Sequence, residues 1–270
     1  MKIILATSNA GKLKEFKSLL APHEIIAYSE ILEPFEIIED ENSFAKNAKI
    51  KAKAVYNALL KAFDGAKNPL LDECKSAWQN GDLAVLSDDS GISVEALNGE
   101  PGIFSARYSS DICAKPTPAS NRAKMIARLN ELNLKSSRAF YTAALALIYG
   151  NFGKNQGKGA NFNQNANGAK NADFSVNFNL NQNASQNEIC YIVHGFLHGQ
   201  VIPFERGENG FGYDFMFIAD GFGRTLGELD ESIKANGTSE LKQENIERIC
   251  EKTWQLLDFS IQKIAKEEKH

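Results

Sequence analysis

The stretch that most constrains the fold is residues 82–108, DLAVLSDDSGISVEALNGEPGIFSARY. An apolar run at 83–86 is long enough for a short buried strand, and it ends at Ser-Asp-Asp-Ser-Gly, residues 87–91. Adjacent carboxylates, Asp88 and Asp89, repel each other at the end of a buried strand unless a cation or solvent relieves them. Mg²⁺ binds through one or two carboxylates together with substrate phosphates. A plain turn is the alternative, because Asp, Ser and Gly all favour turns.

Charge and composition exclude several classes of partner. The 270 residues carry a net charge of -4, so no overall basic field favours nucleic acid or an anionic membrane. No apolar stretch approaches the roughly 20 residues of a membrane span, and the N-terminal apolar run is too short for a secretory signal. We expect a cytoplasmic protein in which the four widely spaced cysteines are buried or free thiols. They are Cys74, Cys113, Cys190 and Cys250.

The N-terminus has the order strand, small polar loop, helix. An apolar run at 3–6 leads into Thr-Ser-Asn-Ala-Gly-Lys at 7–12, and the apolar residues of 13–20 have helical spacing. Ser8 or Asn9 can cap this helix. A helix N-terminus beside hydroxyls and Lys12 is a candidate phosphate site, although the loop lacks the spacing of a Walker A motif.

An acidic segment and a lysine-rich helix follow. We expect a strand at 36–38, then the acidic residues 39–42, then a helix over 43–63 capped by Ser43. Lys51 shares a helix face with Asn47, and Glu39 offers a third carboxylate to the acidic cluster. A solvated surface is the alternative for the lysines. The packing face is Ala48, Ala52, Val55, Tyr56 and Leu59.

The remaining chain predicts a mixture of helices, strands and turns. His194 and His198 are four residues apart, but the run is extended and its glycines suggest a turn between them, which favours a structural role. The expected elements are a short helix near 72–78, a turn at 98–102, a helix at 121–134, strands at 140–149, 188–195 and 215–218, and a long helix at 238–266 that packs on the sheet or at a dimer contact.

Residues 151–187 differ in kind, because Asn, Gly, Gln and Ala dominate and no period is sustained. We interpret them as a low-complexity insertion between two strands of one domain that spans 1–270. A surface insertion that the fold tolerates accounts for this segment, and no function needs to be assigned to it.

Glycines flank aromatic residues at 210–214, Gly-Phe-Gly-Tyr-Asp. Such glycines let backbone approach a flat ligand, and aromatic faces stack on bases. The alternative is a bend that packs Phe211 and Tyr213 into the core.

Each motif is weak alone, but their order is informative. The motifs are Thr7-Ser8-Asn9 with Lys12, Glu39 to Phe44, Asn47-Ala48 with Lys51-Ala52, residues 87–91, residues 101–108, residues 210–214, and Glu228-Leu229 with Lys234. Together they closely resemble the inosine-triphosphate pyrophosphatase family over nearly the whole chain. The resemblance implies an α/β fold, elongated and two-lobed, with a central mixed sheet flanked by helices and a cleft between the lobes. It also implies a homodimer, and Mg²⁺-dependent hydrolysis of deaminated purine nucleoside triphosphates (ITP, dITP, XTP) to monophosphate and pyrophosphate.

The resemblance also implies roles for particular residues. Asp89 matches the general base for the attacking water. The expected ligands of Mg²⁺ are Glu39, Asp88 and Asp89. The expected substrate-binding residues are Thr7, Ser8, Asn9, Ala10, Gly11, Lys12 and Lys51 around the phosphates, Ser90, and Phe211, Gly212, Tyr213, Asp214 and Lys234 around the base.

The chain departs from the family pattern near its end. Four residues after Lys234, where the family has a Ser-His-Arg triplet that helps read the 6-oxo group, stand Thr, Ser and Glu at 238–240. Phe215 replaces a common proline, and Lys46 a common glutamate. Lost polar contacts in a specificity pocket change discrimination by orders of magnitude. The alternative function is therefore a nucleotide-binding homologue with weak or altered turnover.

Overall fold

The computed structural model describes residues 1–20, 22–65, 68–150, 177–178 and 188–229. The predicted helix at 238–266, Lys234, Cys250 and all of 151–187 except 177–178 lie outside the described residues. Four helices are described: α1 Ala10–Leu19, α2 Phe44–Ala62, α3 Pro69–Gln79 and α4 Pro118–Glu131. The strands are β1 Lys2–Leu5, β2 Glu24–Ala27, β3 Leu83–Val94, β4 Ser137–Gly150, β5 Asn177–Phe178, β6 Glu188–Val201 and β7 Phe217–Ala219.

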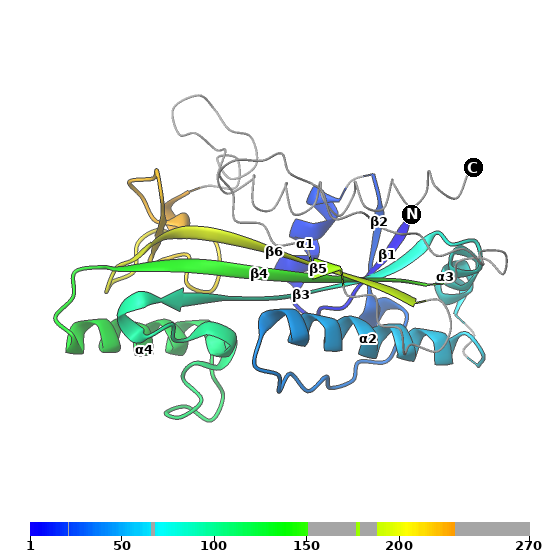
Figure 1. The fold of residues 1–270 in the computed structure, drawn as a ribbon, viewed down its shortest axis with the longest axis horizontal. Coiled ribbons are helices and arrows are strands. Elements are labelled where there is room, and N and C mark those ends of the chain that lie inside the picture. Colours follow the sequence, from blue (N-terminus) through cyan, green and yellow to red (C-terminus); the bar gives the residue numbers. More distant parts are fainter. Residues whose placement is uncertain (21, 66–67, 151–176, 179–187, 230–270) are drawn as a thin grey trace. The chain divides into compact units, whose positions relative to one another are not determined.

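The strands form one mixed sheet, which confirms the predicted α/β class with a central mixed sheet (Figure 1). Its order is β2-β1-β3-β4-β6-β5, and β7 pairs with β6. β1 runs parallel to both β2 and β3, with Ile4 opposite Ile26 and Val85. β5 and β7 are antiparallel to β6.

The chain divides into two compact units. Unit 1 comprises residues 1–41, 45–88 and 145–194, and unit 2 comprises 42–44, 89–144 and 195–270. One boundary between the units falls between Asp88 and Asp89, so β3 contributes residues to both units. One domain over 1–270 remains a prediction.

The core of unit 1 combines parallel strands with the apolar face of α2. Ile4, Val85 and Leu59 are fully buried, and the whole predicted packing face of α2 is buried as well. The side chain of Ser87 donates a hydrogen bond to the carbonyl of Ala48, which joins β3 to α2. The predicted helix at 43–63 is confirmed to within a residue at each end.

Unit 2 has a separate core to which α4, β3, β4 and β7 all contribute. Ile92, Met125, Leu129 and Phe217 belong to one buried cluster. Helix α4 begins at a capping box, where the Thr117 hydroxyl accepts the N–H of Ser120. This cap places the start of α4 three residues before the predicted 121.

Three local predictions were wrong. Residues 36–38 are not a strand, and β2 at Glu24–Ala27 takes the place beside β1 instead. β3 does not stop at Ser87 but runs on to Val94, so the turn alternative for 87–91 is wrong. β6 also continues through His194 and His198 without the expected turn, and the ring of His198 lies against Phe140. In β3 and β6, pairing within the sheet outweighed local turn preference.

Close backbone packing explains how β3 passes Gly91. A Cβ added to Gly91 would lie 2.5 Å from both the carbonyl oxygen of Gly102 and the Oγ of Ser105. The Ser105 hydroxyl accepts the N–H of Ile92 at 2.9 Å and donates to the Gly102 carbonyl at 2.6 Å. A side chain at position 91 would therefore displace the segment that follows β3.

We expect Gly91→Ala to lower the free energy of unfolding by about 1–3 kcal/mol through overpacking. Gly223→Ala is the matched control, because a Cβ there meets nothing within 4 Å. Urea unfolding of both variants measures the difference. Equal stability of the two would contradict the close approach at Gly91.

Candidate active site

The loop between β1 and α1 has the predicted form, with Asn9 as the helix cap. The Oδ1 of Asn9 accepts the N–H of Gly11 at 2.9 Å and of Lys12 at 3.3 Å. The Thr7 hydroxyl accepts the N–H of Asn9 at 3.2 Å, which orients the cap. The loop therefore begins α1 with the positive end of its dipole beside the Lys12 side chain.

Lys12 forms an ion pair with the first of the two adjacent aspartates. Its Nζ lies 2.5 Å from Asp88 Oδ2, and the two side chains are only 18% and 7% exposed. Asp88 Oδ1 is buried and has no hydrogen-bond partner in the described part of the chain. A buried carboxylate with one neutralised oxygen and one unsatisfied oxygen is a suitable ligand for a cation or an ordered water.

A second lysine–carboxylate pair joins α2 to the acidic segment before it. Lys51 Nζ lies 2.9 Å from Glu39 Oε2, and Lys51 is the more buried partner. The buried Asn47 accepts the N–H of Glu41 at 3.1 Å, which ties the acidic segment to the first turns of α2. Asn47 and Lys51 thus share a face of α2 as predicted, and neither is a merely solvated residue.

These carboxylates do not form a ready-made metal cluster. Across the residues that the structure describes, no group of three or more His, Cys, Asp or Glu side chains is placed to hold a metal ion. Glu39 is engaged by Lys51 and Asp88 by Lys12. The assignment of Glu39, Asp88 and Asp89 as metal ligands stays a prediction.

In unit 2, Asp89 and Ser90 are partly buried residues of β3, just before the close approach at Gly91. β3 stays extended here, so the two adjacent carboxylates, Asp88 and Asp89, are carried by a strand and not by the turn that the local sequence favours.

The segment 210–214 is a tight loop organised by Asp214. Asp214 Oδ2 accepts the N–H of Phe211 at 3.1 Å, and the Tyr141 hydroxyl donates to Oδ1 at 3.2 Å. Gly210 has φ +100, and a Cβ there would lie 2.4 Å from Asp214 Oδ2, so this position requires glycine. Burial raises the pKa of Tyr141 well above its ordinary value, which keeps the hydroxyl protonated as a donor.

The two aromatic residues of this loop differ in their exposure to solvent. Tyr213 is 5% exposed and its hydroxyl donates to the carbonyl of Ser105 at 2.8 Å, so it belongs to the core. Phe211 is 55% exposed. The alternative that packs the aromatic residues into the core is therefore correct for Tyr213, and stacking of the exposed Phe211 on a base stays a prediction.

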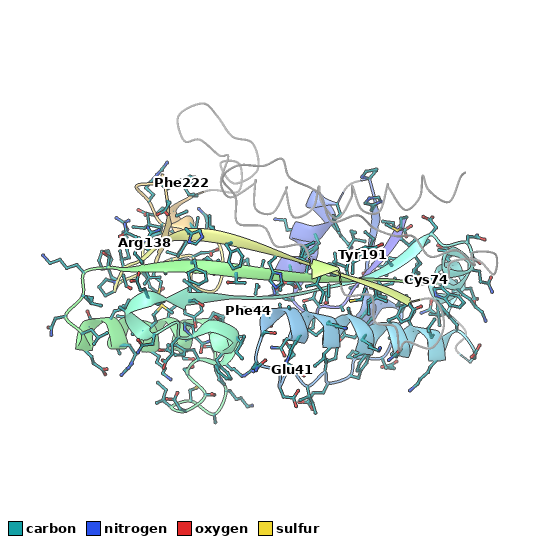
Figure 2. The ribbon with its side chains drawn as sticks, in the orientation of Figure 1. Glu41, Phe44, Cys74, Arg138, Tyr191 and Phe222 are labelled. Carbon is teal, nitrogen blue, oxygen red and sulfur yellow. The ribbon has the colours of Figure 1, made fainter. Side chains whose placement is uncertain are left out.

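Other candidates carry no comparable chemistry. Cys74 on α3 is buried, and burial raises the pKa of its thiol to about 11 (Figure 2). Cys74, Cys113 and Cys190 are free thiols as expected. None of the helices in the described segments is long and apolar enough to cross a membrane.

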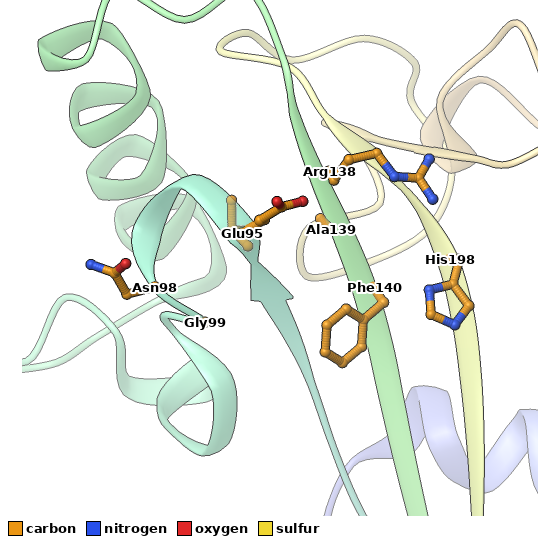
Figure 3. A pocket seen from close by; sticks show the side chains of 8 residues that line it. Glu95, Asn98, Gly99, Arg138, Ala139, Phe140 and His198 are labelled. Carbon is orange, nitrogen blue, oxygen red and sulfur yellow. The ribbon is translucent and has the colours of Figure 1, made fainter. Parts of the chain in front are cut away.

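An open pocket of about 430 Å³ lies in unit 2, where Glu95, Arg138, Phe140 and His198 line it (Figure 3). The Arg138 guanidinium is held by both oxygens of Asp220, at 2.6 and 2.8 Å. None of the predicted site residues lines this pocket.

Sequence reasoning missed two residues that shape the predicted site. Ser105 is hydrogen-bonded to Ile92 of β3 and to Tyr213. Arg122 of α4 contacts Gly212 and Phe215. The motif at 101–108 signalled the first. The partners of Arg122 lie some 90 residues away in sequence, and no local pattern points to them.

Comparison with known proteins identifies the class of protein that these motifs define. The Ham1 family matches residues 3–169 and 153–239, so this chain belongs to the Ham1 family. This confirms the resemblance inferred from the ordered motifs.

Relatives and solved structures agree with this membership. A dITP/XTP pyrophosphatase of Campylobacter hominis is 45% identical over 234 residues, covering 87% of this chain and 88% of the relative. One of Sulfurimonas denitrificans is 38% identical over 253 residues, covering 94% and 100%. The solved HAM1 protein of Coxiella burnetii matches 97% of this chain and 99% of its own with a TM-score of 0.60 at 25% identity.

We expect the Lys12–Asp88 pair to couple energetically. Lys12→Met leaves a buried carboxylate without its counter-charge, and Asp88→Asn removes that charge. The double variant should therefore be more stable than the sum of the single losses predicts, by about 1–3 kcal/mol. Chemical unfolding of the four proteins measures this coupling.

Lys17→Met in the exposed last turn of α1 is the control for loss of a lysine. Fully additive losses for the Lys12 and Asp88 substitutions would show that the pair contributes no interaction energy.

Proposed function

We propose that this protein is a Mg²⁺-dependent nucleoside triphosphate pyrophosphatase that hydrolyses ITP, dITP and XTP to the monophosphate and pyrophosphate. The observation that carries the proposal is membership of the Ham1 family together with relatives named dITP/XTP pyrophosphatase at 38–45% identity over most of the chain. Such an activity removes deaminated purine nucleotides from the nucleotide pool.

The phosphate end of the substrate is assigned to unit 1. The capped N-terminus of α1, with Thr7, Ser8, Asn9, Ala10, Gly11 and Lys12, supplies N–H groups and positive charge for the triphosphate. Lys51 adds a second positive charge. Both lysines pair with carboxylates in the structure, and phosphate oxygens compete for the same ammonium groups in the complex.

The donor set fits Mg²⁺ in its usual mode of binding. Mg²⁺ needs only one or two carboxylates when substrate phosphates and water complete its octahedron. The unsatisfied, buried Oδ1 of Asp88 supports this residue as a ligand, and Glu39 and Asp89 are proposed as further ligands. The ion would neutralise charge on the phosphate oxygens when bound.

Hydrolysis also needs an oriented water and an acceptor for its proton. We assign this acceptor to Asp89, with Ser90 contacting the substrate beside it on β3. Phe211 is assigned to stack on the purine, and the backbone of Gly212, Tyr213 and Asp214 shapes its surroundings. Lys234, outside the described residues, is proposed to contact the base.

A nucleotide-binding homologue with weak turnover is the second candidate. The observation that favours it is Thr-Ser-Glu at 238–240 in place of the expected Ser-His-Arg. We also propose a homodimer, which the family resemblance supports, and no binding of nucleic acid, which the net charge of -4 supports. A cytoplasmic location is proposed from the widely spaced cysteines.

The direct test is pyrophosphate release by the purified chain with Mg²⁺ and, separately, ITP, dITP, XTP, ATP, GTP or dUTP. We expect release from the inosine and xanthine nucleotides and much less from the others. Chelation of the metal should abolish it. Binding of ITP without release from any nucleotide would instead establish the second candidate.

Asp89→Asn keeps the shape of the side chain but removes the proton acceptor. We expect turnover of ITP to fall roughly a hundredfold or more, with nucleotide binding partly retained. Asn42→Asp, which adds a carboxylate to the acidic segment 39–42 rather than removing one, is a control for a change of charge. Unchanged turnover in Asp89→Asn would sink the assignment of Asp89 as base.

A further inference from the structure

Arg122 reaches from α4 to the loop that carries the exposed Phe211. Its Nη1 donates a hydrogen bond to the carbonyl of Gly212 at 2.9 Å. Its Nε lies 3.0 Å from Glu205 Oε2, and its guanidinium carbon lies 4.6 Å from the centre of the Phe215 ring. The side chain is only 12% exposed. One residue thus contacts the loop and the chain on both sides of it.

These contacts use chemistry that only arginine has. A guanidinium is planar, so its edges donate hydrogen bonds while its face lies on an aromatic ring. A lysine ammonium can replace the charge but cannot make the edge and face contacts together. The contact with the Phe215 ring therefore orients the Arg122 guanidinium so that its edge donates to the carbonyl of Gly212.

Arg122 adds an anchor at the glycine that follows the exposed ring. Gly212 has φ +58, a conformation that glycine adopts freely, and a Cβ there would meet nothing within 4 Å. Asp214 holds the N–H of Phe211, but that contact lies on the other side of the exposed ring. The N–H of Asp214 donates to the carbonyl of Phe211 at 3.1 Å, and the bond from Arg122 holds the next peptide, between Gly212 and Tyr213. Together these bonds fix the backbone from which the Phe211 side chain projects.

Helix α4 does not depend on Arg122 for its own place. The neighbouring Asn121 is 3% exposed, accepts the N–H of Ser109 at 2.8 Å and donates to the carbonyl of Ala106 at 2.9 Å. Met125 and Leu129 are fully buried in the core of unit 2. With α4 secured in this way, the contacts of Arg122 act on the loop.

We propose that Arg122, supported by Phe215 and Glu205, is a positioning residue that fixes Phe211 for stacking on the purine base. The proposal rests on the proposed function, because it assigns the exposed ring to the base of the substrate. Loosening the loop weakens binding of the base equally in the ground state and the transition state, so it raises KM and leaves kcat nearly unchanged.

Arg122→Lys is the first variant, and Arg128→Lys is its matched control. Arg128 lies on the same helix, is 47% exposed and pairs with Glu131 one turn away. We expect Arg122→Lys to raise KM for ITP about tenfold, as the loss of a charge-assisted hydrogen bond implies, with kcat close to that of the wild type. Arg128→Lys should leave both constants unchanged.

Two further comparisons separate positioning from a general loss of structure. Phe215→Leu removes the aromatic platform but keeps apolar bulk, and it should also raise KM. In a Phe211→Ala background, Arg122→Lys should add little further rise, because the ring that it positions is already gone. Thermal melting of each variant checks that the fold is retained.

Two results would overturn the proposal. One is an unchanged KM in folded Arg122→Lys, and the other is a rise in KM from Arg122→Lys that is as large in the Phe211→Ala background as in the wild type. Failure of the proposed function has a different signature, namely no turnover by the wild-type chain itself. If the wild type binds ITP without hydrolysing it, the same comparisons are made on dissociation constants, and equal constants for wild type and Arg122→Lys would overturn the inference.

Discussion

The structure depends on strand β3 remaining extended through a sequence that locally favours a turn. β3 is hydrogen-bonded to β1 and β4 in the sheet, and the N–H of Ile92 is bound by the Ser105 hydroxyl. Gly91 allows the close approach that the second contact requires. Because the chain passes from unit 1 to unit 2 within β3, the same strand carries Asp88 in one unit and Asp89 in the other. Each unit then builds its own surroundings for one of these carboxylates.

The two units fix their candidate residues by different means. Unit 1 uses charge, since the ammonium groups of Lys12 and Lys51 are each held in place by a carboxylate. Unit 2 uses backbone geometry, since Asp214, Tyr141 and Arg122 fix a glycine-containing loop around an exposed Phe211. The first arrangement suits phosphates and a cation, and the second suits a flat, uncharged base.

The sequence predicted the elements that have strong local signals. The cap at Asn9, the helix α2 with its buried face and the strand β4 follow from side chains near in sequence. It failed where distant pairing decided the outcome, as at β2, which needs β1 beside it, and at Ser87 to Gly91, where the ladder outweighs turn preference. Arg122 was missed for the same reason. Phe215, noted only as a departure from the family pattern, has a visible role once Arg122 is seen to lie on its ring.

The central claim is that this chain cleaves between the α and β phosphates of a deaminated purine nucleotide. It is tested most directly by hydrolysing ITP with Mg²⁺ in ¹⁸O-labelled water and separating all products. The account predicts inosine monophosphate and pyrophosphate in equal amounts, with the label in one of the two and no inosine diphosphate. Inosine diphosphate with inorganic phosphate as the products would contradict it.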